Sequence, residues 1–197
     1  MTIASGGSVA IGENDSVTIP AGKILILESG GSLTNNGTLT NSGTLTDNRG
    51  IHNDGTIHND GQFNVAAYSY NYGSIDNTGT IDITIQLQNN SGATITSSGT
   101  ITISGVYETL DNGGDLTNNG SITISGESAH LNNSGTLTVE SGGTLTNNGT
   151  YSGSVVNGST AYDGTVTNKE GGTISGNNAA QITTSSGYTD ETTPTEP

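Results

Sequence analysis

Aliphatic and aromatic residues recur every six positions in the first half of this chain. The series is Leu33, Leu39, Leu45, Ile51, Ile57 and Phe63. The repeat unit reads Leu-Thr-Asn-Asn-Gly-Thr, which stands complete at 33–38 and again at 145–150, and close variants begin at Leu39, Ile51 and Ile57. A period of six matches neither the 3.6-residue period of a helix nor the two-residue period of one long strand. It predicts short strands separated by regular turns.

Each hexad supplies one strand and one corner. Alternation along the strand points the aliphatic side chain to one side and the flanking Thr side chains to the other. The Asn-Asn-Gly that follows predicts a turn whose glycine tolerates a left-handed backbone. Because one hexad buries a single aliphatic side chain, the hexads must wind into coils that stack at about 4.8 Å. We expect an all-β, single-stranded β-solenoid, a β-helix, with ladders of Asn side chains at its corners.

The repeat also predicts how the chain is divided. Residues 1–32 are expected to form an N-terminal cap and the first coils, because a solenoid needs its open end covered. The solenoid repeats span 33–186, with an irregular Tyr-rich insertion at 64–73, and 187–197 form a Thr/Pro/Glu tail or linker. At three hexads a coil, we expect about ten coils. The spacing loosens after the insertion, which favours a right-handed winding over a strict left-handed hexapeptide helix.

Composition limits the function classes. The chain has 28% hydrophobic residues, no Cys, and 3 Lys and Arg against 18 Asp and Glu, which gives a formal net charge of −15. Nucleic acid is excluded as a main partner, because binding to a phosphate backbone needs clustered Lys and Arg. No apolar run is long enough for membrane insertion. Enzyme activity is not expected either, since clustered carboxylates with a nearby Lys or Arg are missing from the sequence.

Three tyrosines stand at alternate positions of an extended stretch. Tyr68, Tyr70 and Tyr72 therefore share one face, where their rings could stack on sugar rings or on a partner protein. The alternative is that they cover an irregular coil.

A second candidate site is the tandem pair His52-Asn-Asp-Gly and His58-Asn-Asp-Gly. His52, Asp54, His58 and Asp60 fall at equivalent places on neighbouring faces, and two His with two Asp could bind a divalent transition metal. The alternative is that they are solvated turn variants of Asn-Asn-Gly. No other cofactor is expected.

The strings at 30–46 and 17–23 resemble the repetitive β-solenoids of microbial surface proteins, including filamentous-haemagglutinin-like and autotransporter-type adhesins and related archaeal surface proteins. The resemblance implies an extracellular or cell-surface location and a scaffold or adhesive role, although no export signal stands at the N-terminus. We expect a structural or adhesive rod that self-assembles end to end into a filament. Its partners would be further copies of itself or surface glycans.

Three alternatives to the rod remain open. The first is an ice-binding module, suggested by Thr-x-Thr strands such as Thr38-Leu-Thr40 and Thr144-Leu-Thr146. The second is a glycan-binding module, and the third is a viral tail-fibre shaft.

Overall fold

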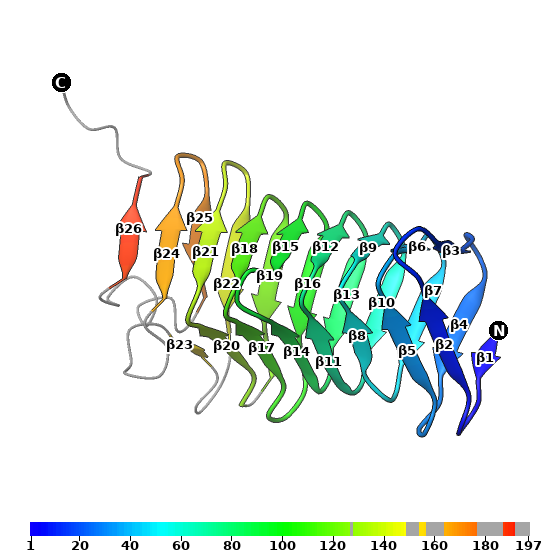
Figure 1. Cartoon of the computed structure of the whole chain (residues 1–197). Coiled ribbons are helices and arrows are strands. Elements are labelled where there is room, and N and C mark those ends of the chain that lie inside the picture. The colour runs from blue at the N-terminus through cyan, green and yellow to red at the C-terminus, as the bar shows by residue number, and fades with distance from the viewer. Residues whose placement is uncertain (127, 149–153, 157–163, 177–186, 192–197) are drawn as a thin grey trace.

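The structure, a computed structural model, describes residues 1–126, 128–148, 154–156, 164–176 and 187–191. Its strands pair in parallel into three long sheets, and these sheets together form the walls of a single solenoid (Figure 1). No helix occurs among the described residues. The predicted all-β solenoid is confirmed, and the right-handed winding stays a prediction.

Each coil contributes one strand to each sheet. Sheet A contains β1 (Thr2–Ile3), β4 (Ile24–Leu27), β7 (Thr44–Asp47), β10 (Gln62–Val65), β13 (Thr80–Ile83), β16 (Thr100–Ile103), β19 (Ser121–Ile124), β22 (Thr144–Asn147) and β25 (Thr173–Ser175). Sheet B contains β2 (Ser8–Ile11), β5 (Ser32–Asn35), β8 (Ile51–Asn53), β11 (Tyr68–Asn71), β14 (Gln86–Asn89), β17 (Thr109–Asn112), β20 (His130–Asn133) and β23 (Ser154–Val156). Sheet C contains β3 (Ser16–Ile19), β6 (Thr38–Asn41), β9 (Thr56–Asn59), β12 (Ser74–Asn77), β15 (Thr94–Ser97), β18 (Asp115–Asn118), β21 (Thr136–Val139), β24 (Thr165–Asn168) and β26 (Tyr188–Asp190).

The hexad spacing sets the length of the coil. Leu33 pairs with Ile51, and Leu45 pairs with Phe63, so three hexads close one turn. Asn35 and Asn53, at the same corner, are 18 residues apart. Later coils are longer, with 20 residues between Asn77 and Ser97 and 23 between Asn89 and Asn112. Each sheet therefore contains eight or nine described strands, one for each coil that crosses it. This number is lower than the ten coils that a uniform hexad predicts.

The predicted insertion at 64–73 is wrong. Residues 64 and 65 belong to β10 and residues 68–71 to β11, and Asn53 still pairs with Asn71 at the 18-residue spacing. The hexad continues because Ser69 takes the inward position that an aliphatic residue holds elsewhere, and it is 2% exposed. Its hydroxyl donates to the buried carboxylate of Asp47, which also accepts from the backbone N–H of Ile51 at 3.0 Å. A matched polar pair thus replaces one apolar contact of the core.

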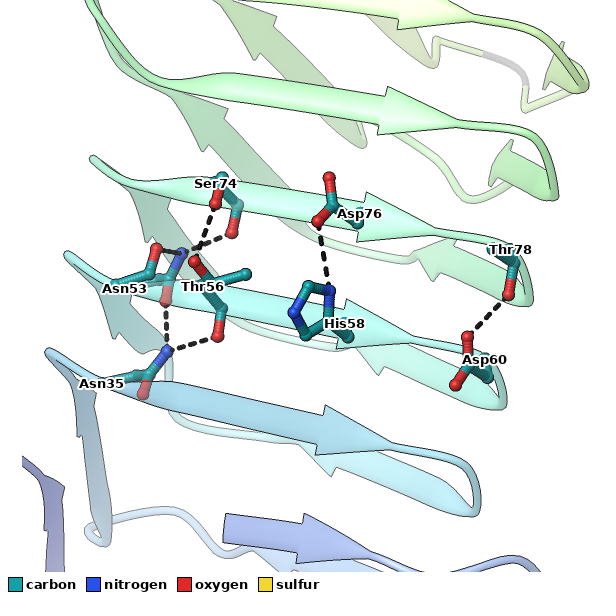
Figure 2. Close-up of polar contacts among 9 residues, drawn as sticks. Asn35, Asn53, Thr56, His58, Asp60, Ser74, Asp76 and Thr78 are labelled. Carbon is teal, nitrogen blue, oxygen red and sulfur yellow. Dashed lines mark hydrogen bonds and ion pairs between the residues drawn. The ribbon is translucent and has the colours of Figure 1, made fainter. Parts of the chain in front are cut away.

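Ladders of buried Asn side chains run along two corners, as the sequence predicts. Asn35 donates to Asn53 at 2.6 Å and Asn53 to Asn71 at 2.7 Å, and each Nδ2 also reaches a backbone carbonyl of the next coil (Figure 2). Every donor points toward the C-terminal end. The Oδ1 of Asn35 therefore has no donor among the residues that the structure describes, because its neighbour on the N-terminal side is Ile11. The ladder satisfies corner backbone groups that the sheets leave unpaired.

The corner glycines have a different role from the one predicted. No positive φ occurs at Gly37, Gly55 or Gly73, so a left-handed turn is not what requires them. They stack directly on one another: a Cβ on Gly55 would lie 2.1 Å from the carbonyl oxygen of Gly37, and one on Gly73 would lie 2.0 Å from that of Gly55. Only glycine lets successive corners approach this closely.

Neither end matches its predicted description completely. Residues 1–32 form the first coils, but they leave this end open, since Val17 is 36% and Ile24 51% exposed. At the other end, Tyr188–Asp190 of the predicted tail form β26, which pairs with β24. Tyr188 packs against the core beside Val166, and this apolar contact extends the solenoid into the segment. The rest of the predicted tail, 192–197, lies outside the described residues.

Candidate functional site

The three outward faces of the solenoid differ in composition. Sheets A and C present mainly Ser and Thr, as with Thr100 and Thr102 on β16. These hydroxyls stack between coils, and Thr56 lies 3.0 Å from the Ser74 hydroxyl on sheet C (Figure 2). Sheet B instead presents aromatic, imidazole, amide and carboxylate side chains. It is therefore the candidate functional face.

Two columns of outward side chains run along sheet B. In register, the first contains Tyr68, Gln86, Thr109 and His130, and the second contains His52, Tyr70, Gln88, Asp111 and Asn132. Asp111 joins the columns across three coils. It accepts hydrogen bonds from Gln86 Nε2 and from Asn132 Nδ2, the latter at 2.7 Å. These contacts fix the orientation of the polar side chains on this face.

The predicted tyrosine row lies on this face. Tyr68, Tyr70 and Tyr72 are 60%, 38% and 47% exposed, on or just after β11. The Tyr72 ring centroid lies 4.9 Å from that of His52, which belongs to the preceding coil. A regular coil thus carries three exposed tyrosine rings on one face. Their role in binding stays a prediction.

Two clefts adjoin Tyr68. One has a volume of about 450 Å³ and is lined by Ser32, Arg49, Gly50, Ile51, His52, Tyr68 and Tyr70. The other has a volume of about 380 Å³ and is lined by Tyr68, Thr84, Ile85, Gln86, Val106, Tyr107, Glu108 and Thr109. Tyr68 lines both clefts, and together their linings reach from β5 to β17. Both volumes are within the usual range for ligand sites.

The predicted metal ligands are divided between two faces. His52 Nε2 lies 3.0 Å from Asp54 Oδ2 on sheet B, whereas His58, on sheet C, has its Nδ1 3.1 Å from Asp76 Oδ2 (Figure 2). Asp60 accepts from the Thr78 hydroxyl at 2.8 Å. The structure thus forms two separate His–Asp pairs, and one of them uses an Asp outside the predicted set.

Neither pair acquires a third acidic or imidazole ligand. Within the described ranges, no three His, Asp or Glu side chains gather at one point as a metal centre would require.

Sequence reasoning missed two residues of the second cleft. Glu108 points inward in front of β17 and is 9% exposed, while the neighbouring Tyr107 is 77% exposed. They lie in the loop between β16 and β17, which helps to lengthen this coil to 23 residues between Asn89 and Asn112. The excess over 18 residues is the signal that could have located them, because loops on a regular scaffold commonly carry binding groups.

Comparison with known proteins identifies no relative: no family model, curated protein or solved structure matches the chain. In the part of the chain that the structure describes, there is no helix with the length and apolar character needed to cross a membrane.

Proposed function

We propose that the chain is an extracellular structural or adhesive rod that assembles end to end through its open N-terminal coil. The observation that carries this proposal is the uncovered edge of that coil. β1, β2 and β3 are the first strands of sheets A, B and C, so within the described residues one edge of each pairs with no other strand. Unpaired parallel edges are templates for strands of another chain.

The same end exposes apolar surface. A cleft of about 330 Å³ opens there, lined chiefly by Met1, Ile3, Val9, Val17, Ile19, Pro20, Ile24, Leu25, Leu33 and Leu39. Met1 is 78% and Ile24 51% exposed. Burial of such side chains contributes about 25 cal/mol per Å² of apolar area, so covering this end is favourable.

A second copy can supply the cover with its C-terminal coil. The last described strands there are β25 and β26, at the opposite edges of sheets A and C. All neighbouring strands in the solenoid are parallel, and head-to-tail docking preserves this direction across the junction. A contact of this kind joins unlike surfaces and generates an open filament rather than a closed dimer.

Sedimentation velocity and negative-stain microscopy over rising protein concentration test the proposal. We expect rods whose length grows in multiples of one chain, and Val17→Asp is expected to abolish this growth by placing a charge in the junction. Val106→Asp is the matched control, because Val106 is equally apolar and 55% exposed but lies on the side of the rod. Short monomers at every concentration would overturn the proposal.

Ice binding is the second candidate, and one feature of sheet A favours it. From β16 onward every outward strand position on this sheet is Ser or Thr: Thr100, Thr102, Ser121, Thr123, Thr144, Thr146, Thr173 and Ser175. The hydroxyls form two straight columns with the spacing of the coils. Elsewhere, Asp82 on sheet A and Asp76 on sheet C interrupt such columns. Thermal hysteresis near the freezing point tests this function, and its absence would remove it.

A further inference from the structure

We infer that the two clefts beside Tyr68 bind a neutral polysaccharide chain. In this site Tyr68 and Tyr107 stack on sugar rings, and Glu108 accepts a hydrogen bond from a sugar hydroxyl. The inference goes beyond the proposed rod, because it concerns the flank of the solenoid and does not depend on assembly at its end.

One carboxylate oxygen of Glu108 has no hydrogen-bond donor among the described residues. Glu108 lines the second cleft and is 9% exposed, and this oxygen, Oε2, is buried. The carboxyl group packs against the loop, since a Cβ on Gly105 would lie 1.8 Å from Oε1. A buried carboxylate oxygen without a donor is costly. A ligand hydroxyl that reaches this oxygen therefore gains more than it would at the surface.

Tyr107 shows that the loop over Glu108 is under strain. Its φ is 92°, and it is the one non-glycine residue with a positive φ in the described chain. The ring is 77% exposed, so packing of the ring does not explain this backbone conformation. Strained residues of this kind concentrate at ligand sites. When a ligand displaces the loop to reach Oε2 of Glu108, the backbone of Tyr107 can relax at the same time.

The side chains of the clefts match the chemistry of a sugar. A sugar ring has an apolar C–H face, which packs on exposed tyrosine rings such as Tyr68 and Tyr107. Its hydroxyls both donate and accept, and the clefts offer the Glu108 carboxylate as an acceptor together with Gln86 and Arg49 as donors. A polyanion is disfavoured by the net charge of −15. The ligand is therefore a neutral sugar.

The arrangement of the clefts favours a polymer over a single ring. Because Tyr68 lines both clefts, a bound chain can pass from one to the other across it. The linings include residues of five successive strands of sheet B: β5, β8, β11, β14 and β17. One sugar ring would fill only one of the two clefts.

Affinity gel electrophoresis of the full chain tests the inference. The probes are the soluble neutral polysaccharides dextran, mannan, xylan, amylose and hydroxyethyl cellulose, with polygalacturonate as the anionic comparison. We expect at least one neutral polysaccharide to retard the protein and polygalacturonate not to do so. Tyr68→Ala is expected to weaken that binding on the order of tenfold, by loss of the stacking contact.

Two further variants separate binding from folding. Tyr107→Gly removes the ring and permits the positive φ, so it should raise the melting temperature while weakening binding on the order of tenfold. Glu108→Gln should also weaken binding without lowering the melting temperature. Gln88→Ala is the matched control and should leave binding unchanged, because Gln88 is an outward side chain of the same face that lines neither cleft.

The outcomes decide the question. Retention by no neutral polysaccharide would overturn the inference, as would binding that Tyr68→Ala and Tyr107→Gly leave unchanged. Binding to polygalacturonate alone would refute the neutral class of ligand. Since none of these variants changes the N-terminal coil, failure of the sugar site leaves the end-to-end assembly to be judged by its own experiment.

Discussion

Truncation of one buried rung, Asn71→Ala, tests whether the Asn ladder stabilises the solenoid. Asn71 is 0% exposed, and its side chain takes part in four hydrogen bonds. It accepts from Asn53 Nδ2 at 2.7 Å. Its own Nδ2 donates to Asn89 Oδ1 at 2.8 Å, to the Thr94 carbonyl at 3.0 Å and to the Gly73 carbonyl at 3.2 Å.

The cost of this truncation can be estimated from the partners left behind. The Nδ2 of Asn53 keeps two carbonyl acceptors, at 3.1 and 3.2 Å, so its loss is small. The Oδ1 of Asn89 loses its donor and stays buried, which costs about 1–3 kcal/mol, and the remaining lost bonds add about 1 kcal/mol. We expect a total of roughly 2–4 kcal/mol, a large part of the 5–15 kcal/mol that is typical for a domain.

Urea unfolding followed by far-ultraviolet circular dichroism measures this cost. The matched control is Asn64→Ala, because Asn64 lies on the outward side of β10, where it accepts from Gln62 Nε2 at 2.8 Å and donates to the Thr46 hydroxyl at 3.3 Å, and neither partner is buried. We expect a change within about 0.5 kcal/mol for that surface variant. If the two variants unfold at the same urea concentration, the buried ladder contributes no stability and the reasoning is refuted.

Three further predictions concern a corner, the core and the C-terminal strand. Gly55→Ala should lower the urea midpoint strongly, because its Cβ would lie 2.1 Å from a backbone oxygen. Ser69→Ala should cost about 1–3 kcal/mol in the same assay, since the buried Asp47 carboxylate loses a hydroxyl donor. Above pH 10, β26 should detach from β24 and become sensitive to cleavage by subtilisin. The reason is that two groups at this strand have raised pKa values in the folded chain. The hydrogen bond and charge of Glu191 raise the pKa of Lys169, and burial raises the pKa of Tyr188.

The sign of the pH effect follows from proton binding. Both pKa values lie higher in the folded chain, so the folded state binds more protons as the pH rises through this range, and stability falls. The contribution is complete below the unfolded pKa values, near 10. Unchanged cleavage between pH 8 and pH 11 would contradict this.

Matched variants control the other two predictions. Gly22→Ala places a Cβ where no atom lies within 4 Å, so only its φ of +72° opposes the change. A loss as large as that of Gly55→Ala would mean that close stacking is not the reason for the corner glycines. Ser98→Ala removes an exposed serine hydroxyl. If it matches Ser69→Ala, the contact with Asp47 carries no stability.

Much of the fold was predictable, because a strict repeat leaves few ways to bury its aliphatic residues. The spacing from Leu33 to Phe63 predicted both the strands and a coil of three hexads, and the register confirms them. The Asn ladder was also predictable, because like residues stack on like in a solenoid. The candidate site was predicted only in part: alternation placed Tyr68 and Tyr70 on one face, but it did not indicate Tyr107 or Glu108.

The sequence by itself determined the solenoid, since a period in the chain becomes contacts between neighbouring coils whatever the details of the turns. Only the tertiary structure decided which residues lie above one another, because this depends on the length of every coil between them. That is why Ser69 lies in the core beside Asp47 and why His58 meets Asp76 instead of Asp60. A loop that lengthens one coil likewise leaves Glu108 buried and the neighbouring Tyr107 exposed with a positive φ, which no local pattern records.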